Sequence, residues 1–182
     1  MRRIVLSLAV LGAVSFGACS GGGTVLNSVG ANTPDKVILT VASSTNVPRV
    51  LPGAGLPISA VAVKGGANGV LSNNRFTWSA ALVTSGAYTF NTTGQTKPCQ
   101  AVTMTTGGTT TPFGVDFSIY ITIDPSNEAN VIFTPPTIIP PPAGSSITPH
   151  YPYCVIVNAT TVDSNVVGSL TVAVVDPQNP LQ

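Results

Sequence analysis

The fold depends most on two stretches near the end of the chain, Tyr153-Cys154-Val155-Ile156-Val157-Asn158-Ala159 and Ser169-Leu170-Thr171-Val172-Ala173-Val174-Val175. Both are rich in β-branched residues and carry apolar side chains at odd and even positions alike. A strand with apolar residues on both faces is covered on both sides. Between the two stretches, Asp163-Ser164-Asn165 and Gly168 supply turn residues. The sequence therefore predicts two central strands joined by a turn.

Shorter strand-like runs alternate with turn residues in the preceding part of the chain. No segment after the N-terminal apolar run shows helical periodicity, so about eight short strands in an all-β sandwich are predicted. Residues 134–152 contain Pro140-Pro141-Pro142, and we expect them to run as an extended loop over the surface. The earlier expected strands are residues 37–41, 58–63, 75–79, 88–91, 101–105 and 131–133.

The clearest alternation of apolar and polar residues lies in residues 115–124, which read Val-Asp-Phe-Ser-Ile-Tyr-Ile-Thr-Ile-Asp. A period of two places one face of a strand in a core and the other in water. The pattern predicts one long strand that ends at Pro125. Asp116 and Asp124 would then lie at opposite ends of its solvent face, about 26 Å apart, too far for paired carboxylate chemistry.

Two segments resemble bacterial immunoglobulin-like domains. Residues 57–80, with Val61-Ala62-Val63, Gly69 and Phe76-Thr77-Trp78-Ser79, look like the first half of such a domain, and the closing strand pair looks like its last hairpin. The resemblance implies an immunoglobulin-like β-sandwich with Trp78 in the core; sugar stacking is the alternative role of Trp78. Val61 stands about where an antibody-type domain has its first core cysteine. Residues 81–150 exceed the family's middle section, so we expect an enlarged middle.

Few residues of this chain are charged. The charged fraction is 7%, and after the first 18 residues five basic and six acidic side chains remain, a formal charge of −1. Nucleic-acid binding depends on clustered Lys and Arg, so this composition argues against a nucleic-acid partner. Its polar surface must come from Ser, Thr, Asn and Gln, which suits an exported β-rich protein.

The N-terminus has the pattern of an export signal. A basic start at Arg2 and Arg3 precedes an apolar run at residues 4–13, which is too short to span a bilayer. Phe16-Gly17-Ala18-Cys19 resembles the bacterial lipobox, which implies cleavage before Cys19 and diacylation of its sulfur. The alternative is an ordinary signal peptide cut near Ala18, which leaves Cys19 as a free thiol. Two acyl chains are sufficient for stable membrane attachment.

These features predict the organisation of the whole chain. Residues 1–18 form the signal peptide, residues 19–35 the lipidated Cys19 with a Gly- and Ser-rich tether, residues 36–177 the single sandwich domain, and residues 178–182 a tail. Ser20, directly after the cysteine, resembles lipoproteins sorted to the outer membrane. The expected location is therefore the bacterial cell envelope, with the protein anchored to the outer membrane or cell surface.

The two other cysteines are expected to form a disulfide. If Cys19 is acylated, Cys99 and Cys154 are the remaining pair, and an exported protein is in an oxidising compartment. The bond would close a loop of about 55 residues and contribute about 4 kcal/mol. A redox role is the alternative, but the spacing is not Cys-x-x-Cys. No metal site and no cofactor are predicted.

No residue pattern predicts catalysis. His150 lies beside aromatic residues at the end of the proline-rich passage, and a surface-loop role is favoured over catalysis because no nucleophile motif accompanies it. Asp163-Ser164-Asn165 fits a turn better than a calcium site. Tyr151 and Tyr153 are the aromatic residues proposed for ligand contact.

Three function classes follow. The preferred one is a non-enzymatic envelope module for adhesion, assembly or protein contact, with the membrane and an envelope protein or glycan as partners. The second is a carbohydrate-binding module that uses exposed aromatic side chains. The third, a hydrolase built around His150, is disfavoured by the low number of titratable groups.

Overall fold

The computed structural model describes residues 33–42, 48–65, 69–71, 74–83, 86–90 and 95–179, without the side chains of residues 88–90 and 95. The chain divides into two units, Met1–Thr33 and Pro34–Gln182, and the fold described here belongs to the second. In the described residues, every regular element is a strand except the 3-10 helix η1 (Ser118–Tyr120). The predicted all-β class is confirmed.

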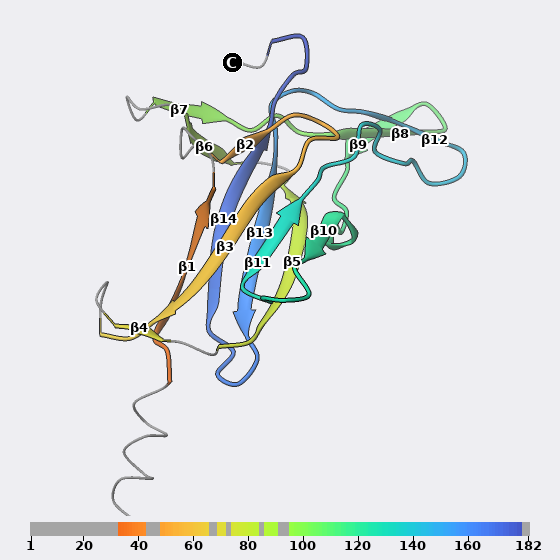
Figure 1. The fold of residues 1–182 in the computed structure, drawn as a ribbon. Coiled ribbons are helices and arrows are strands. Elements are labelled where there is room, and N and C mark those ends of the chain that lie inside the picture. The colour runs from red at the N-terminus through yellow and green to blue at the C-terminus, as the bar shows by residue number, and fades with distance from the viewer. Residues whose placement is uncertain are drawn as a thin grey trace, which may run out of the picture. The chain divides into compact units, whose positions relative to one another are not determined.

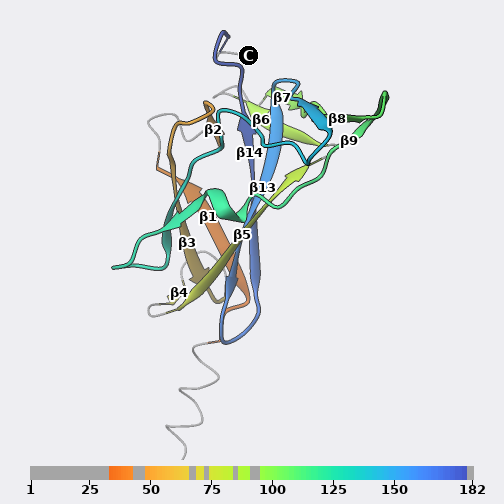
Figure 2. The same ribbon diagram turned by 90° about the vertical axis from the view of Figure 1, so that its right-hand side faces the viewer.

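Two sheets form a sandwich (Figures 1 and 2). The first, here called the β3 sheet, has the order β1-β3-β11-β10, and β4 also pairs with β3. The second, the β13 sheet, has the order β2-β14-β13-β5. The strands are β1 (Lys36–Val41), β2 (Arg49–Val50), β3 (Leu56–Val63), β4 (Val70–Leu71), β5 (Phe76–Val83), β10 (Ile121–Ile123), β11 (Asn130–Phe133), β13 (Tyr153–Thr161) and β14 (Val167–Val174).

The strand order is that of an immunoglobulin-like sandwich. Such domains place their first, second, fifth and fourth strands in one sheet and their third, sixth and seventh in the other. Here β1, β3, β11 and β10 take the first set of places, and β5, β13 and β14 the second, while β2 adds a short parallel strand beside β14. The predicted fold class is therefore confirmed.

The core lies between the inner faces of the two sheets. Every second residue of β13 points inward and is buried, as Tyr153, Val155 and Val157 show. They belong to the same cluster as Ile58 of β3 and Phe133 of β11. On the outer face of β13, Cys154 is buried, but Ile156, Asn158 and Thr160 are half-buried. The prediction that β13 and β14 are central is confirmed, but the outer face of β13 is fully covered only at its Cys154 end.

Residues 115–124 do not form the single strand that their alternation predicts. The first half lies along β5, where the N–H of Leu82 donates to the carbonyl of Val115 at 3.0 Å and the N–H of Phe117 donates to the carbonyl of Ala80 at 2.8 Å. Helix η1 follows, and the second half is β10, which pairs with β11 in the other sheet. The segment therefore crosses from the β13 sheet to the β3 sheet at η1.

The crossing changes which side chains are buried. A 3-10 helix has about three residues per turn, so the period of two is lost there. Phe117 is fully buried, whereas Ile119 is 78% exposed, although the alternation places both on one face. Asp116 makes an isolated bridge with Ala81, while Asp124 follows β10 in the other sheet. The single-strand prediction is wrong, and the carboxylate separation derived from it no longer applies.

Trp78 packs against the core from the inner face of β5. Its side chain is half-buried, its ring lies 6.5 Å from that of Phe76, and its Nε1–H donates to the carbonyl of Glu128 at 2.8 Å. The expected position of Val61 is wrong by one residue. Val61 is half-buried on the outer side of β3, and its neighbours Ala60 and Ala62 face the core.

The enlarged middle section builds two small sheets at one end of the sandwich (Figures 1 and 2). Gly107 and Gly108, with φ of 58° and 82°, form the two-residue turn between β8 and β9, as a tight hairpin requires. Part of the passage predicted as loop, residues 134–152, is strand β12, which pairs with β8. The strands are β6 (Ala87–Phe90), β7 (Gln95–Pro98), β8 (Thr103–Thr106), β9 (Thr109–Pro112) and β12 (Ser145–Thr148).

Gly168 allows the two sheets to approach each other at β1 and β14. A Cβ at this position would lie 2.6 Å from the carbonyl oxygen of Val37 and 2.6 Å from Cδ1 of Leu39. Because one neighbour is backbone, Gly168→Ala should force the strands apart and lower the free energy of unfolding by about 1–3 kcal/mol. Urea denaturation tests this, with Val167→Ala as the exposed neighbour expected to change stability by less than about 0.5 kcal/mol. Equal stability of the two variants would contradict the close approach.

Candidate functional site

Tyr153 is not available for ligand contact, so that prediction is wrong. Its side chain is 1% exposed because it occupies an inward position on β13. Its ring contacts that of Phe117 edge-on at 6.4 Å and lies 5.5 Å from the ring of Tyr151. Tyr151 is half-buried and precedes the cis peptide bond to Pro152. Of the predicted pair, only Tyr151 keeps an accessible surface.

Both phenol groups stay protonated at neutral pH. Burial raises the pKa of Tyr153 well above its ordinary value. The pKa of Tyr151 is also raised, first by desolvation and then by the negative charge of Asp176. Neither tyrosine therefore offers a phenolate for acid–base or nucleophilic chemistry at neutral pH.

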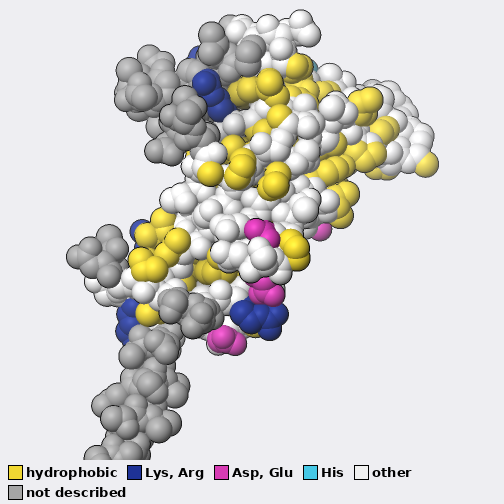
Figure 3. All heavy atoms as spheres, in the orientation of Figure 1, with side chains coloured by type: hydrophobic (Ala, Val, Ile, Leu, Met, Phe, Trp, Pro, Cys, Tyr) yellow, Lys and Arg dark blue, Asp and Glu magenta, His cyan; other side chains and the backbone are white. Residues whose placement is uncertain are grey.

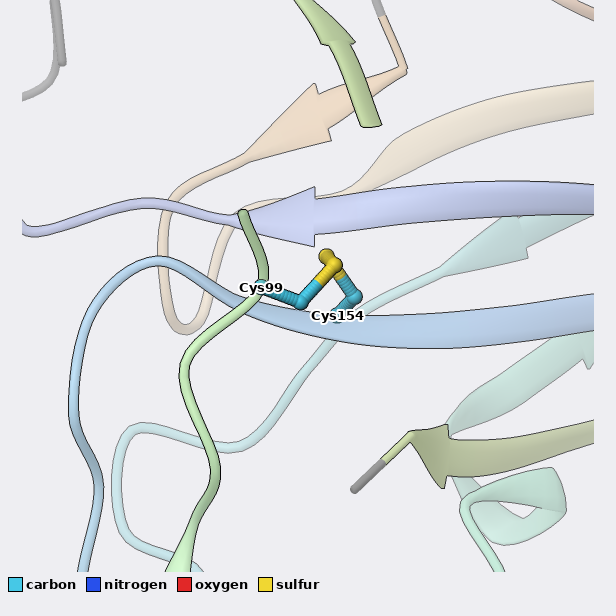
Figure 4. Close-up of a disulfide and its surroundings, with 2 residues drawn as sticks. All are labelled: Cys99 and Cys154. Carbon is cyan, nitrogen blue, oxygen red and sulfur yellow. A yellow bond between two sulfur atoms is a disulfide. The ribbon is translucent and has the colours of Figure 1, made fainter. Parts of the chain in front are cut away.

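The predicted disulfide between Cys99 and Cys154 is present (Figure 4). The sulfur atoms are bonded, the two Cα atoms are 5.4 Å apart, and the sequence separation is 55 residues. Cys99 follows β7 and Cys154 lies in β13, where both pack with Ala173 and Val175. The bond therefore attaches the enlarged middle section to the outer face of the β13 sheet. Cys19 lies outside the described residues.

The β3 sheet carries a groove on its outer face. Its volume is about 520 Å³, and it extends over β3, β11 and β10. Ser59 and Asn130 lie side by side in it, with the Ser59 hydroxyl donating to Oδ1 of Asn130 at 2.8 Å. Figure 3 shows exposed apolar side chains on the face that β3 and β11 present in Figure 1. The groove is lined by Pro57, Ile58, Ser59, Thr122, Ile123, Asp124, Pro125, Asn130, Val131 and Ile132.

An ion pair lies near the end of the sandwich that holds the β10–β11 connection. The guanidinium of Arg75 donates to both carboxylate oxygens of Glu128, each at 3.2 Å. Both side chains are largely exposed, so the pair contributes little to stability. Figure 3 shows basic and acidic side chains side by side in the lower part of this face. Because Trp78 holds the carbonyl of Glu128, the ion pair and the tryptophan fix the same connection.

Asp116 and Asp124 each receive local hydrogen bonds from a serine two residues on. For Asp124, the Ser126 hydroxyl at 2.6 Å and the Ser126 N–H at 2.8 Å both donate to Oδ1. These bonds lower the pKa of the Asp124 carboxyl, with the hydroxyl the larger cause. The pKa of Asp116 is lowered in the same way by Ser118. Both side chains are therefore negatively charged at neutral pH.

Ser126→Ala should raise the pKa of Asp124 toward its ordinary value, because the stronger of the two donors is lost. A pKa that is lower in the folded state gives a stabilisation that is present at neutral pH and lost as the pH falls through the lowered value. Ser126→Ala should therefore reduce the loss of stability on acidification. A titration of side-chain carboxyl shifts by NMR measures this, with Asp116 as the internal control. An unchanged Asp124 pKa would contradict the role of the hydroxyl.

The other predicted positions lie apart from the groove. His150 is exposed in the segment between β12 and β13, and Asp163-Ser164-Asn165 forms the β13–β14 turn, with φ of Asn165 at 55°. In the part of the chain that the structure describes, no group of three or more His, Cys, Asp or Glu residues is placed to hold a metal ion. No helix among those residues is long and apolar enough to cross a membrane.

Sequence reasoning missed the groove because its residues come from three strands far apart in the chain. Asn130 and Ser59 are 71 positions apart and become neighbours only through the pairing of β11 with β3. The sequence held no signal for it: Ile132 lies in an apolar run, and only the structure shows that its side chain is 46% exposed. Comparison with known proteins adds no functional assignment: no protein-family model, no curated protein and no solved structure matches this chain.

Proposed function

We propose that this protein is a non-enzymatic, lipid-anchored component of the bacterial cell envelope whose immunoglobulin-like domain makes protein contacts in adhesion or assembly. One observation carries the anchoring. The chain has three cysteines, and Cys99 and Cys154 are joined in the disulfide, so Cys19 is the one that remains. It stands at the end of the lipobox-like sequence Phe16-Gly17-Ala18-Cys19. Acylation would account for an odd cysteine in an oxidising compartment.

Protein contact is favoured over carbohydrate binding. Carbohydrate recognition by stacking requires exposed, flat aromatic side chains, but Tyr153 is buried, Trp78 faces the inside of the sandwich, and Tyr151 is half-buried. The outer face of the β3 sheet instead offers neutral polar and apolar side chains around the groove. Surfaces of this mixed composition are common at protein–protein interfaces.

The intact mass of the full chain, extracted from membranes in detergent, tests the anchoring. The expected mass is that of residues 19–182 plus acyl chains, with two thiols that react with an alkylating reagent only after reduction. Cys19→Ala should release the protein into the soluble fraction, whereas Cys99→Ala, the matched cysteine control, should leave it in the membrane. An unacylated product with Cys19 free or cross-linked would overturn the anchoring.

A further inference from the structure

The outer edge of β10 has backbone groups that point away from the sheet. Asp124 donates its N–H to the carbonyl of Asn130 at 3.0 Å, and Thr134 donates its N–H to the carbonyl of Tyr120 at 2.9 Å. Hydrogen-bonded pairs alternate along an antiparallel ladder, so the backbone of Thr122 is bonded to β11 and the backbone groups of Ile123 point away from it. The N–H and carbonyl of Ile123 therefore lie on the open edge, together with the carbonyl of Ile121.

The other edges of the two main sheets are covered or short. Residues 115–117 hydrogen-bond along β5, and β1 packs against β14 at Gly168. The fourth edge strand, β2, has two residues. The exposed strand β9 belongs to a small sheet. The N–H of Phe113 donates to the carbonyl of Val102, so the preceding residue, Pro112, has its backbone nitrogen on the open side of the strand. Proline has no N–H there to offer a partner. Of these edge strands, β10, with three residues, is thus the one best suited to pair with another strand.

Exposed apolar side chains surround the β10 edge. Ile119, before β10, is 78% exposed, and Ile123 at its end is 43% exposed. Natural edges are usually protected by lysine, proline or a covering element. The two residues of β10 whose backbone groups face the open edge are isoleucines, Ile121 and Ile123, and Pro125 follows only after the strand has ended. This combination favours a binding edge over a protected one.

The charge around this edge selects the partner. Lys97 is the last basic residue of the sequence, and residues 98–182 contain five acidic residues and neither lysine nor arginine. Asp124 pairs with Asn130, so its carboxylate lies on the outer face of the sheet, in the row that includes the groove. Ile123 lies in the next row, which faces inward with Val131. A second copy of β10 would bring Arg75 with it, but that guanidinium is already bonded to Glu128 of its own β10–β11 connection, so electrostatics offer Asp124 little in self-pairing.

We propose that β10 binds an extended segment of a partner protein by strand addition, and that this segment alternates basic and apolar residues. The alternation follows from the pleat: side chains of the added strand on the outer face would meet Asp124, and those on the inner face would meet Ile123. The exposed Ile119 of η1 adds an apolar side chain just before the start of this edge. Long basic side chains would also lay their methylene stems along Ile132 in the groove. This inference deepens the proposed role in protein contact. It rests on that role in one respect, namely that the partner is a protein.

A synthetic eight-residue peptide of alternating lysine and valine is the probe, titrated against the full chain in detergent. We expect saturable binding that weakens as salt rises, together with slower hydrogen exchange at the Ile123 amide. Two control peptides separate the contributions. One has the same composition but lysines and valines in separate blocks, and the other carries N-methyl groups on alternate backbone nitrogens. Both should bind at least several-fold more weakly.

Variants of the protein test the same contacts. Ile123→Pro removes the outward N–H without breaking the bonds to β11 and should weaken binding about 3- to 10-fold relative to Ile123→Ala. Asp124→Asn should weaken binding several-fold, whereas Asp176→Asn, the matched control, should not. Salt-sensitive binding without protection of Ile123, equal binding of the N-methylated peptide, a dimer formed through β10, or no binding at all would each overturn the proposal. If the peptide does not bind but Cys19 is acylated, only the strand-addition proposal is overturned. If the peptide binds but the chain is unacylated, only the anchoring is overturned.

Discussion

Phe117→Ala is expected to lower the free energy of unfolding by about 3–5 kcal/mol, the range for removing a fully buried phenylalanine. The Phe117 side chain has no exposed surface, and its ring contacts those of Tyr120 at 5.1 Å and Tyr153 at 6.4 Å. It lies directly before η1, where the chain crosses between sheets. The substitution therefore leaves a cavity at the point where both sheets meet. Urea denaturation at equilibrium measures the loss.

Ile119→Ala is the matched control, two residues further along the chain. Ile119 is 78% exposed, so its truncation should change stability by less than about 0.5 kcal/mol. If residues 115–124 formed one strand, both side chains would face the core and both substitutions would be costly. Losses of similar size for Phe117→Ala and Ile119→Ala would therefore show that the crossing at η1 is incorrect.

Removal of the disulfide by the double substitution Cys99→Ala and Cys154→Ala should cost about 4 kcal/mol and lower the melting temperature by roughly 10 °C. The bond spans 55 residues, so its loss restores much conformational freedom to the unfolded chain. It also releases the middle section from the β13 sheet. Calorimetry of the oxidised protein, the reduced protein and the double variant measures the effect.

The double variant should be insensitive to reductant, while the wild-type protein should melt like the variant once it is reduced. Cys19→Ala, which leaves the disulfide intact, controls for cysteine removal and should melt like the wild type. A wild-type melting temperature that does not change on full reduction would contradict a stabilising role for the bond.

Local pattern was sufficient to predict the central part of the fold. The apolar residues on both faces of β13 and β14 reflect the sheet packed on their inner face and the middle section attached to their outer face at the Cys154 end. The disulfide was also predictable, because the lipobox-like sequence at Cys19 leaves one pair of cysteines. In both cases the deciding information lies in the residues themselves.

Prediction failed where a contact between distant segments decides the structure. The alternation in residues 115–124 is real, but the hydrogen bonds that Val115 and Phe117 make with β5 are not visible in it, nor is the turn at η1. Tyr153 was proposed as an exposed aromatic for ligand contact, yet its place on β13 makes it core. The groove could not be predicted because its floor joins Ser59 to Asn130 across two strands.

The short parallel pairing of β2 with β14 would be loaded in shear when the chain is stretched across it. The N–H of Ala173 donates to the carbonyl of Pro48 at 2.7 Å, and the N–H of Val175 donates to the carbonyl of Val50 at 3.0 Å. When the chain before β2 and the chain after β14 are pulled apart, parallel strands must slide past each other, so both bonds are loaded at once. We expect the pairing to resist such a pull through two bonds that break together, although β2 is the shortest strand of the β13 sheet.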